Sequence, residues 1–93
     1  MKALSTEAAQ LRLRDMHGWK NEAAELIKTF QFEDFRAALG FVNKVGEAAE
    51  HAGHHPDIDI RYNRVRLALT THDAGGLTEK DFDLARQADQ LSN

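Results

Sequence analysis

Residues 54–69 read HHPDIDIRYNRVRLAL, and the rest of the predicted fold is arranged around them. Pro56 restricts the residue before it to extended backbone, so the chain cannot be helical at this point. Apolar and polar residues then alternate on both sides of Asn63, which is typical of strands with one buried face. The stretch therefore predicts a β-hairpin.

A turn at Asn63-Arg64 lets the apolar residues of one hairpin face pair with one another. The predicted pairs are Tyr62 with Val65, Ile60 with Leu67, and Ile58 with Leu69. Two features oppose this register. It sets Arg61 opposite Arg66, and it gives Arg64 a turn position that favours glycine or asparagine.

A long helix precedes the hairpin. Residues 33–51 repeat apolar side chains at helical spacing, and Gly53 marks the end of this helix. The apolar positions are Phe35, Ala38, Leu39, Val42, Val45, Ala48 and Ala49. Before the helix, residues 26–32 alternate as a strand, with Phe30 and Phe32 as its core contacts.

Both ends of the chain predict further helices. Ser5 or Thr6 caps a first helix that stops at Gly18, and a short extended stretch follows it. Thr78 and Asp81 have the spacing of a capping box at the start of the last helix. Because strands and helices do not alternate as βαβ units, we expect an α+β fold with helices on one face of an antiparallel sheet.

The composition limits the possible functions. With 42% hydrophobic and 29% charged residues, the 93-residue chain is ordinary for one globular domain spanning residues 1–93. It has no cysteine, which excludes disulfides and suits a reducing cytoplasm. We expect no transmembrane helix, because apolar runs are short, and no signal peptide. The net charge of −3 argues against a nucleic-acid partner.

Histidines are the candidate functional residues. The chain has five, and His51, His54 and His55 fall close together. The predicted register sets His72 opposite His55, where cross-strand Cβ atoms lie about 5 Å apart. In an extended segment His54 points away from His55 and lines another wall of the same cleft. Imidazole titrates at about pH 6.5, so it can both give and take protons near neutral pH. These three side chains therefore predict an acid–base site.

Two other interpretations compete with an acid–base site. An imidazole at a helix C-terminus interacts favourably with the helix dipole, which accounts for His51. Three histidines could also hold zinc, but Gly53 and Pro56 interrupt the helix between His51 and His55. A helical i, i+4 zinc-binding pair is therefore missing, and we expect no metal. For Asp81, capping the last helix is the competing role.

The candidate residues form a spaced signature. In order along the chain it consists of Glu50, His54, His55, Pro56, Tyr62, His72 and Asp81. This spacing resembles that of the pterin-4a-carbinolamine dehydratase family, and the similarity extends from residue 18 to residue 91. Two positions depart from the commonest family pattern. Gly53 stands where an acidic residue often precedes the histidine pair, and Ile58 stands where a large aromatic residue is frequent.

The resemblance implies a fold, an assembly and an activity. The fold is a four-stranded antiparallel sheet with about three helices packed on one face, and the assembly is a homodimer or homotetramer. The activity is dehydration of 4a-hydroxytetrahydrobiopterin to quinonoid dihydropterin and water, which recycles the pterin of aromatic amino acid hydroxylases without a cofactor of the enzyme's own. The resemblance makes His54, His55 and His72 catalytic. The residues that support or contact the substrate are Glu50, Pro56, Thr71, Asp73 and Asp81.

Dehydration needs an acid, because hydroxide is a poor leaving group until it is protonated. We expect His54 and His72 to act as acids on opposite faces of the pterin, while His55 orients it. Relatives of this fold also serve as partners of transcription factors. A non-catalytic dimerisation or protein-interaction module is therefore the alternative function.

Overall fold

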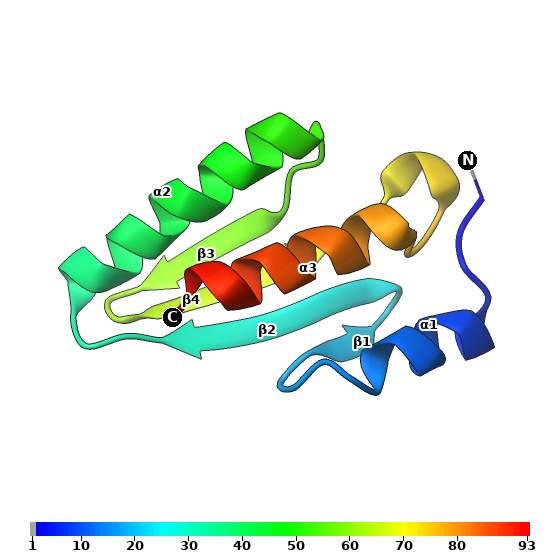
Figure 1. The fold of residues 1–93 in the computed structure, drawn as a ribbon, viewed down its shortest axis with the longest axis horizontal. Helices are drawn as coiled ribbons and strands as arrows, with labels where there is room; N and C mark the ends of the chain where they lie inside the picture. The colour runs from blue at the N-terminus through cyan, green and yellow to red at the C-terminus, as the bar shows by residue number, and fades with distance from the viewer. Residues whose placement is uncertain (1) are drawn as a thin grey trace.

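The computed structural model describes residues 2–93 as a single layer of helices on an antiparallel sheet (Figure 1). The α-helices are α1 Thr6–Leu13, α2 Phe35–Ala52 and α3 Glu79–Leu91, and a short 3-10 helix, η1, spans His72–Ala74. The strands are β1 Lys20–Glu22, β2 Glu25–Gln31, β3 Asp57–Arg61 and β4 Arg64–Leu69. In these residues the sheet has four strands in the order β1-β2-β4-β3. The expected α+β fold is confirmed.

The core lies between the sheet and the helices α2 and α3, which run side by side across one sheet face (Figure 1). Alternate residues of the two central strands point into it because side chains of a strand alternate between faces. Its strand residues are Leu26, Phe30, Val65, Leu67 and Leu69, all of which are buried. From the helices, Phe82 and Val45 are almost completely buried against them. No helix within residues 2–93 is long and apolar enough to cross a membrane.

The hairpin forms as predicted, but the predicted register is wrong. The observed pairs are Asp57–Ala68, Ile58–Leu67, Asp59–Arg66, Ile60–Val65 and Arg61–Arg64. The turn therefore lies at Tyr62-Asn63 instead of Asn63-Arg64, and every pair shifts by two residues. This register sets Asp59 opposite Arg66, but it still sets one arginine opposite another, Arg61 and Arg64, beside the turn.

The turn also anchors the hairpin to the segment before α2. The side-chain amide of Asn63 donates a hydrogen bond to the carbonyl of Phe32 at 2.9 Å. The backbone N–H of Phe32 donates in return to the carbonyl of Asn63 at 2.8 Å. Tyr62 adopts a φ of 49°, a left-handed conformation that is unusual for a residue with a side chain. The Asn63 contacts stabilise the turn at this position despite that cost.

Helix α2 starts slightly later than predicted and ends where predicted. Asp34 caps it by accepting a hydrogen bond from the N–H of Ala37 at 2.9 Å. At its end, Gly53 takes a φ of 61°, which confirms the predicted stop. Not every apolar position faces the core, since Phe35 is 46% exposed and Leu39 is 43% exposed. These two side chains instead form an apolar surface on the outer side of α2.

The remaining elements match the prediction with shifted bounds. Helix α1 is capped by Ser5 and ends at Leu13, well before Gly18. Strand β2 ends at Gln31, and Phe32 packs against the core from just beyond it. At the start of α3, the side chain of Thr78 and that of Asp81 form the predicted capping box.

Candidate active site

Residues from three separate segments line one pocket of about 270 Å³, which we call the histidine pocket. They come from the α2–β3 connection, the segment after β4, and the first turn of α3. The lining residues are Gly53, His54, His55, Thr70, Thr71, His72, Asp73 and Lys80. The three histidines of the predicted site therefore meet at one cavity, although His55 and His72 are far apart in the sequence.

The end of α2 places His54. Gly53 closes the helix in a left-handed conformation, and its N–H donates to the carbonyls of Ala49 and Glu50. The backbone N–H of His54 donates to the same Ala49 carbonyl at 3.1 Å. This tight helix end turns the chain toward α3, so the side chain of His54 is buried.

The buried carboxylate of Asp81 holds His54 in place. Its Oδ1 lies 2.5 Å from Nε2 of His54. Its Oδ2 accepts hydrogen bonds from Oγ1 of Thr71 at 2.8 Å and from the N–H of Thr78 at 2.9 Å. An ionised carboxylate only accepts hydrogen bonds, so Nε2 of His54 must be the donor. Nδ1 is then the ring nitrogen of His54 that can exchange a proton with a bound molecule.

His55 lies on the opposite side of the backbone and is exposed, as the alternation of an extended segment predicts. Its Nε2 lies 2.5 Å from Oε2 of Glu50, one turn back in α2. Glu50 and Pro56 do not line the histidine pocket. They line an adjoining groove of about 430 Å³ that shares only His55 with it. Two of the predicted substrate-binding residues are therefore set beside the histidine pocket.

A closed loop after β4 places His72 and Asp73. The carbonyl of Thr71 accepts from the N–H groups of Ala74, Gly75 and Gly76 at 3.0, 3.1 and 3.3 Å. Gly75 has a φ of 75°, which favours glycine at this point. The loop leaves the side chains of His72 and Asp73 exposed at the pocket.

The route by which His72 reaches the pocket differs from the predicted one. Continued past the strands, the observed register sets Thr70, not His72, opposite His55. The predicted cross-strand pairing of the two histidines is wrong for this reason, and η1 brings His72 to the cavity instead. Sequence reasoning missed Thr70 and Lys80 among the lining residues. For Lys80 the sequence does contain a signal, because a lysine in the first turn of a helix occupies a position where acidic residues are preferred.

Asp81 and Thr71 act as supports more than as pocket surface. Asp81 is 0% exposed and does not line the cavity, while Thr71 is buried and lines it in part. The hydroxyl of Thr71 donates to the carboxylate of Asp81, and its Oγ1 also lies 2.9 Å from Oγ1 of Thr78. Asp81 thus caps α3 and fixes His54 with different oxygens, so the two roles considered for it are compatible.

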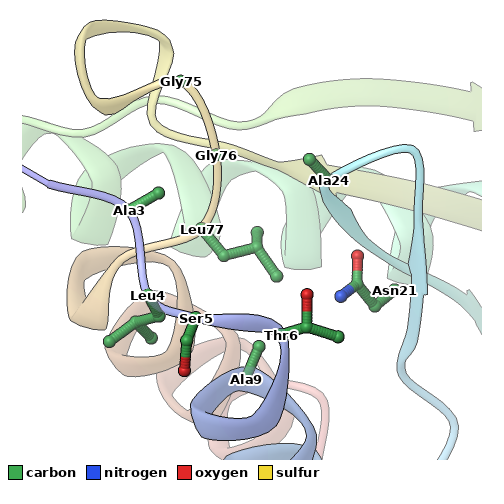
Figure 2. A pocket seen from close by; sticks show the side chains of 10 residues that line it. All are labelled: Ala3, Leu4, Ser5, Thr6, Ala9, Asn21, Ala24, Gly75, Gly76 and Leu77. Carbon is green, nitrogen blue, oxygen red and sulfur yellow. The ribbon is translucent and has the colours of Figure 1, made fainter.

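A second hollow offers no acid–base groups. Figure 2 shows a pocket of about 230 Å³ between the N-terminal segment, the β1–β2 turn and the end of the η1 loop. Its ten lining residues, from Ala3 to Leu77, include no titratable side chain. Within residues 2–93, no group of three or more His, Cys, Asp or Glu side chains is arranged to hold a metal ion. The histidine pocket is therefore the candidate active site.

Sequence comparisons agree with one another. A family model described as pterin 4 alpha carbinolamine dehydratase matches residues 2–91. A protein of Acidobacterium capsulatum, named "Putative pterin-4-alpha-carbinolamine dehydratase", is 60% identical over 91 residues, which are 98% of this chain and 99% of that protein. A protein of the same name from Roseiflexus sp. is 56% identical over 88 residues, which are 95% of each chain.

Solved structures share the fold. A structure from Brucella melitensis, described as a transcriptional coactivator/pterin dehydratase, has a TM-score of 0.96 and 32% identity, covering 99% of this chain and 100% of that one. A pterin dehydratase-like protein described as a RuBisCO assembly factor in the alpha-carboxysome has a TM-score of 0.71 and 23% identity, covering 84% and 93%. The second likeness shows the fold alone.

Proposed function

Because the chain belongs to the pterin 4 alpha carbinolamine dehydratase family, we propose that it is an active dehydratase of 4a-hydroxytetrahydropterins. Its products are quinonoid dihydropterin and water, and its role is to recycle the pterin of aromatic amino acid hydroxylases. One observation carries the proposal. Three histidines from two distant segments line a single cavity, and one of them, His54, is fixed by a buried carboxylate.

The reaction moves two protons. An acid gives a proton to the 4a-oxygen as the C4a–O bond breaks, while the N5 lone pair forms the C4a=N5 bond. N5 then loses its own proton, so the net loss is one molecule of water. Positioned acid–base groups accelerate such steps by about 10²- to 10⁴-fold. The proposed acids are His72 and His54, the latter through Nδ1, because its Nε2 is engaged by Asp81.

His55 and the residues around it orient the substrate in this proposal. The carboxylate of Glu50 lies at hydrogen-bond distance from the ring of His55. Pro56 restricts the backbone of His55, the residue before it, to extended geometry. Thr71 keeps the carboxylate of Asp81 aligned with His54. Asp73 lines the pocket with an exposed carboxylate, which suits the N–H groups of a pterin ring.

We also infer that the chain assembles as a homodimer or homotetramer. The support is the exposure of three large apolar side chains, Phe35 and Leu39 on α2 and Ile58 on β3, which are 46%, 43% and 38% exposed. Large apolar side chains left exposed on two elements that contact each other favour contact with another protein surface. A second copy of the chain is the occupant that the proposed assembly requires.

The direct test is turnover of freshly generated 4a-hydroxytetrahydropterin by the purified protein. We expect it to accelerate dehydration well above the spontaneous rate. Single substitutions of His54, His55 or His72 by alanine should each lower the rate, whereas His17→Ala, outside the pocket, should not. An inert wild-type protein that binds another polypeptide would instead support the alternative function, a non-catalytic interaction module.

A further inference from the structure

Lys80 brings a cation to the histidine pocket. It lies in the first turn of α3, which begins just after the η1 loop (Figure 1). Apart from the three histidines, it is the only basic residue among those that line the pocket. Its backbone N–H donates to Oγ1 of Thr78 at 3.3 Å, which fixes the point at which the side chain leaves the helix. Within residues 2–93 its ammonium forms no ion pair.

The carboxylates that neighbour Lys80 on α3 are engaged elsewhere. Glu79 accepts hydrogen bonds from an arginine of α1. Asp83 accepts one from an arginine of α3 itself at 3.1 Å. Asp81 is buried and already accepts from three donors. Among the residues that line the pocket, Asp73 is therefore the carboxylate that remains beside Lys80.

The position of Lys80 opposes the local preference of the helix. The N-terminus of a helix carries a partial positive charge, so a cation in its first turn is unfavourable. Glu79 and Asp81 on either side follow the usual preference, and Lys80 does not. Departures from a local rule without a structural compensation are expected at functional sites.

We propose that Lys80 is a substrate-positioning residue that donates a hydrogen bond to the C4 carbonyl oxygen of the pterin ring. This inference rests on the proposed function, because it states which edge of the proposed substrate Lys80 contacts. The edge of a pterin that carries C4, N3 and C2 presents one acceptor, the carbonyl oxygen, beside two donors, N3–H and the 2-amino group. Lys80 and Asp73 offer the complementary pair, since an ammonium only donates and a carboxylate only accepts.

The inference is tested by comparing two ring systems. Binding of an oxidised pterin and of the matching 2,4-diaminopteridine, in which an amino group replaces the carbonyl oxygen and N3 carries no hydrogen, is titrated by fluorescence. The wild-type protein should favour the pterin by about tenfold or more, because a site that hydrogen-bonds one group rejects the analogue that lacks it. Lys80→Met, which keeps the aliphatic stem, should lose most of this preference and keep only the part that comes from N3–H and Asp73. Lys80→Arg should keep most of it.

Controls separate a positioning role from a structural one. Lys44→Met removes an exposed lysine of α2 and should leave the preference unchanged. The thermal midpoint of Lys80→Met should equal or exceed that of the wild type, since a cation leaves the helix N-terminus. Steady-state dehydration should show a raised KM with kcat within about twofold. An unchanged pterin preference in Lys80→Met would overturn this inference alone. A wild-type protein that binds no pterin would overturn the proposed function and this inference together.

Discussion

Nε2 of His54 lies 2.5 Å from Oδ1 of Asp81, a carboxylate that is 0% exposed. The other oxygen of this carboxylate accepts from Thr71 and from the backbone of Thr78. A single buried group thus links the start of α3, the loop after β4 and the end of α2. The histidine that it orients lines the proposed active site.

Asp81→Asn should reduce both stability and activity. The amide nitrogen that replaces one oxygen is a donor. It either faces the donors of Thr71 and Thr78 or forces Nε2 of His54 to give up its proton, which should cost on the order of 3 kcal/mol of unfolding free energy. Because His54 loses its fixed orientation, kcat should fall by about 100-fold. Urea denaturation and dehydration kinetics measure the two effects. Asp83→Asn, an exposed residue of the same helix, is the control and should change neither by much.

Glu79 and Arg12 give the protein a weak dependence of stability on pH. The hydrogen bond from Arg12 lowers the pKa of Glu79 below its ordinary value of 4.5, and the charges of Arg12 and Arg86 add to this effect, whereas burial opposes it. A carboxyl group with a lowered pKa stabilises the fold above that ordinary value, and this contribution disappears as the pH falls through the lowered pKa. Glu79→Gln should therefore be slightly less stable than the wild type at neutral pH.

The two proteins should become equally stable in acid. Urea denaturation of both at about pH 7 and about pH 3 measures this convergence. A stability difference that stays the same at both pH values would contradict the Arg12–Glu79 account. Arg12→Gln should reproduce the neutral-pH loss, because it removes the same ion pair from the other side.

Tyr62→Gly should stabilise the protein. Tyr62 has a φ of 49° and is 67% exposed, so its side chain contributes little burial to offset a left-handed backbone. Relief of that strain should outweigh the entropy of glycine and raise the unfolding free energy by about 0.5–1 kcal/mol. Arg61→Gly, in the adjacent strand, should lower it instead. Denaturant titrations compare the variants, and a loss of stability in Tyr62→Gly would argue against the observed turn.

Leu39→Glu should dissociate the proposed homo-oligomer. Leu39 is 43% exposed on the outer side of α2, so a carboxylate there costs the isolated chain little but would be buried in an interface. Light scattering coupled to gel filtration gives the mass of each variant. Lys44→Glu changes the charge of an exposed position on the same helix and serves as the control. A wild-type protein that elutes as a monomer would exclude the assembly.

Sequence alone predicts the elements better than their pairing. Shifting the hairpin by two residues keeps Ile58 and Ile60 on the same face, so hydrophobic alternation cannot distinguish the two registers. The charge pattern does not distinguish them either, because each register sets one arginine opposite another, so the register depends on the turn anchored by Asn63. The anchor joins the turn to a carbonyl far away in the chain, which no local pattern reveals.

The site was predictable to a similar extent. The predicted hairpin register indicates a shared cavity for His54, His55 and His72. The structure brings all three to one pocket, but η1 and not the predicted register places His72 there. The capping-box spacing gives Asp81 its role at the start of α3. Its second contact, to a histidine 27 residues away, depends on how α2 packs against α3 and could not be read from local sequence.

The most direct test of the central claim uses the five histidines as internal probes. An oxidised pterin is titrated into the protein while the imidazole resonances are followed by NMR. We predict that the rings of His54, His55 and His72 shift together with one dissociation constant, while the rings of His17 and His51, which do not line the pocket, stay unchanged. Shifts confined to residues outside the histidine pocket, or no shift of the three rings at saturating pterin, would contradict the account.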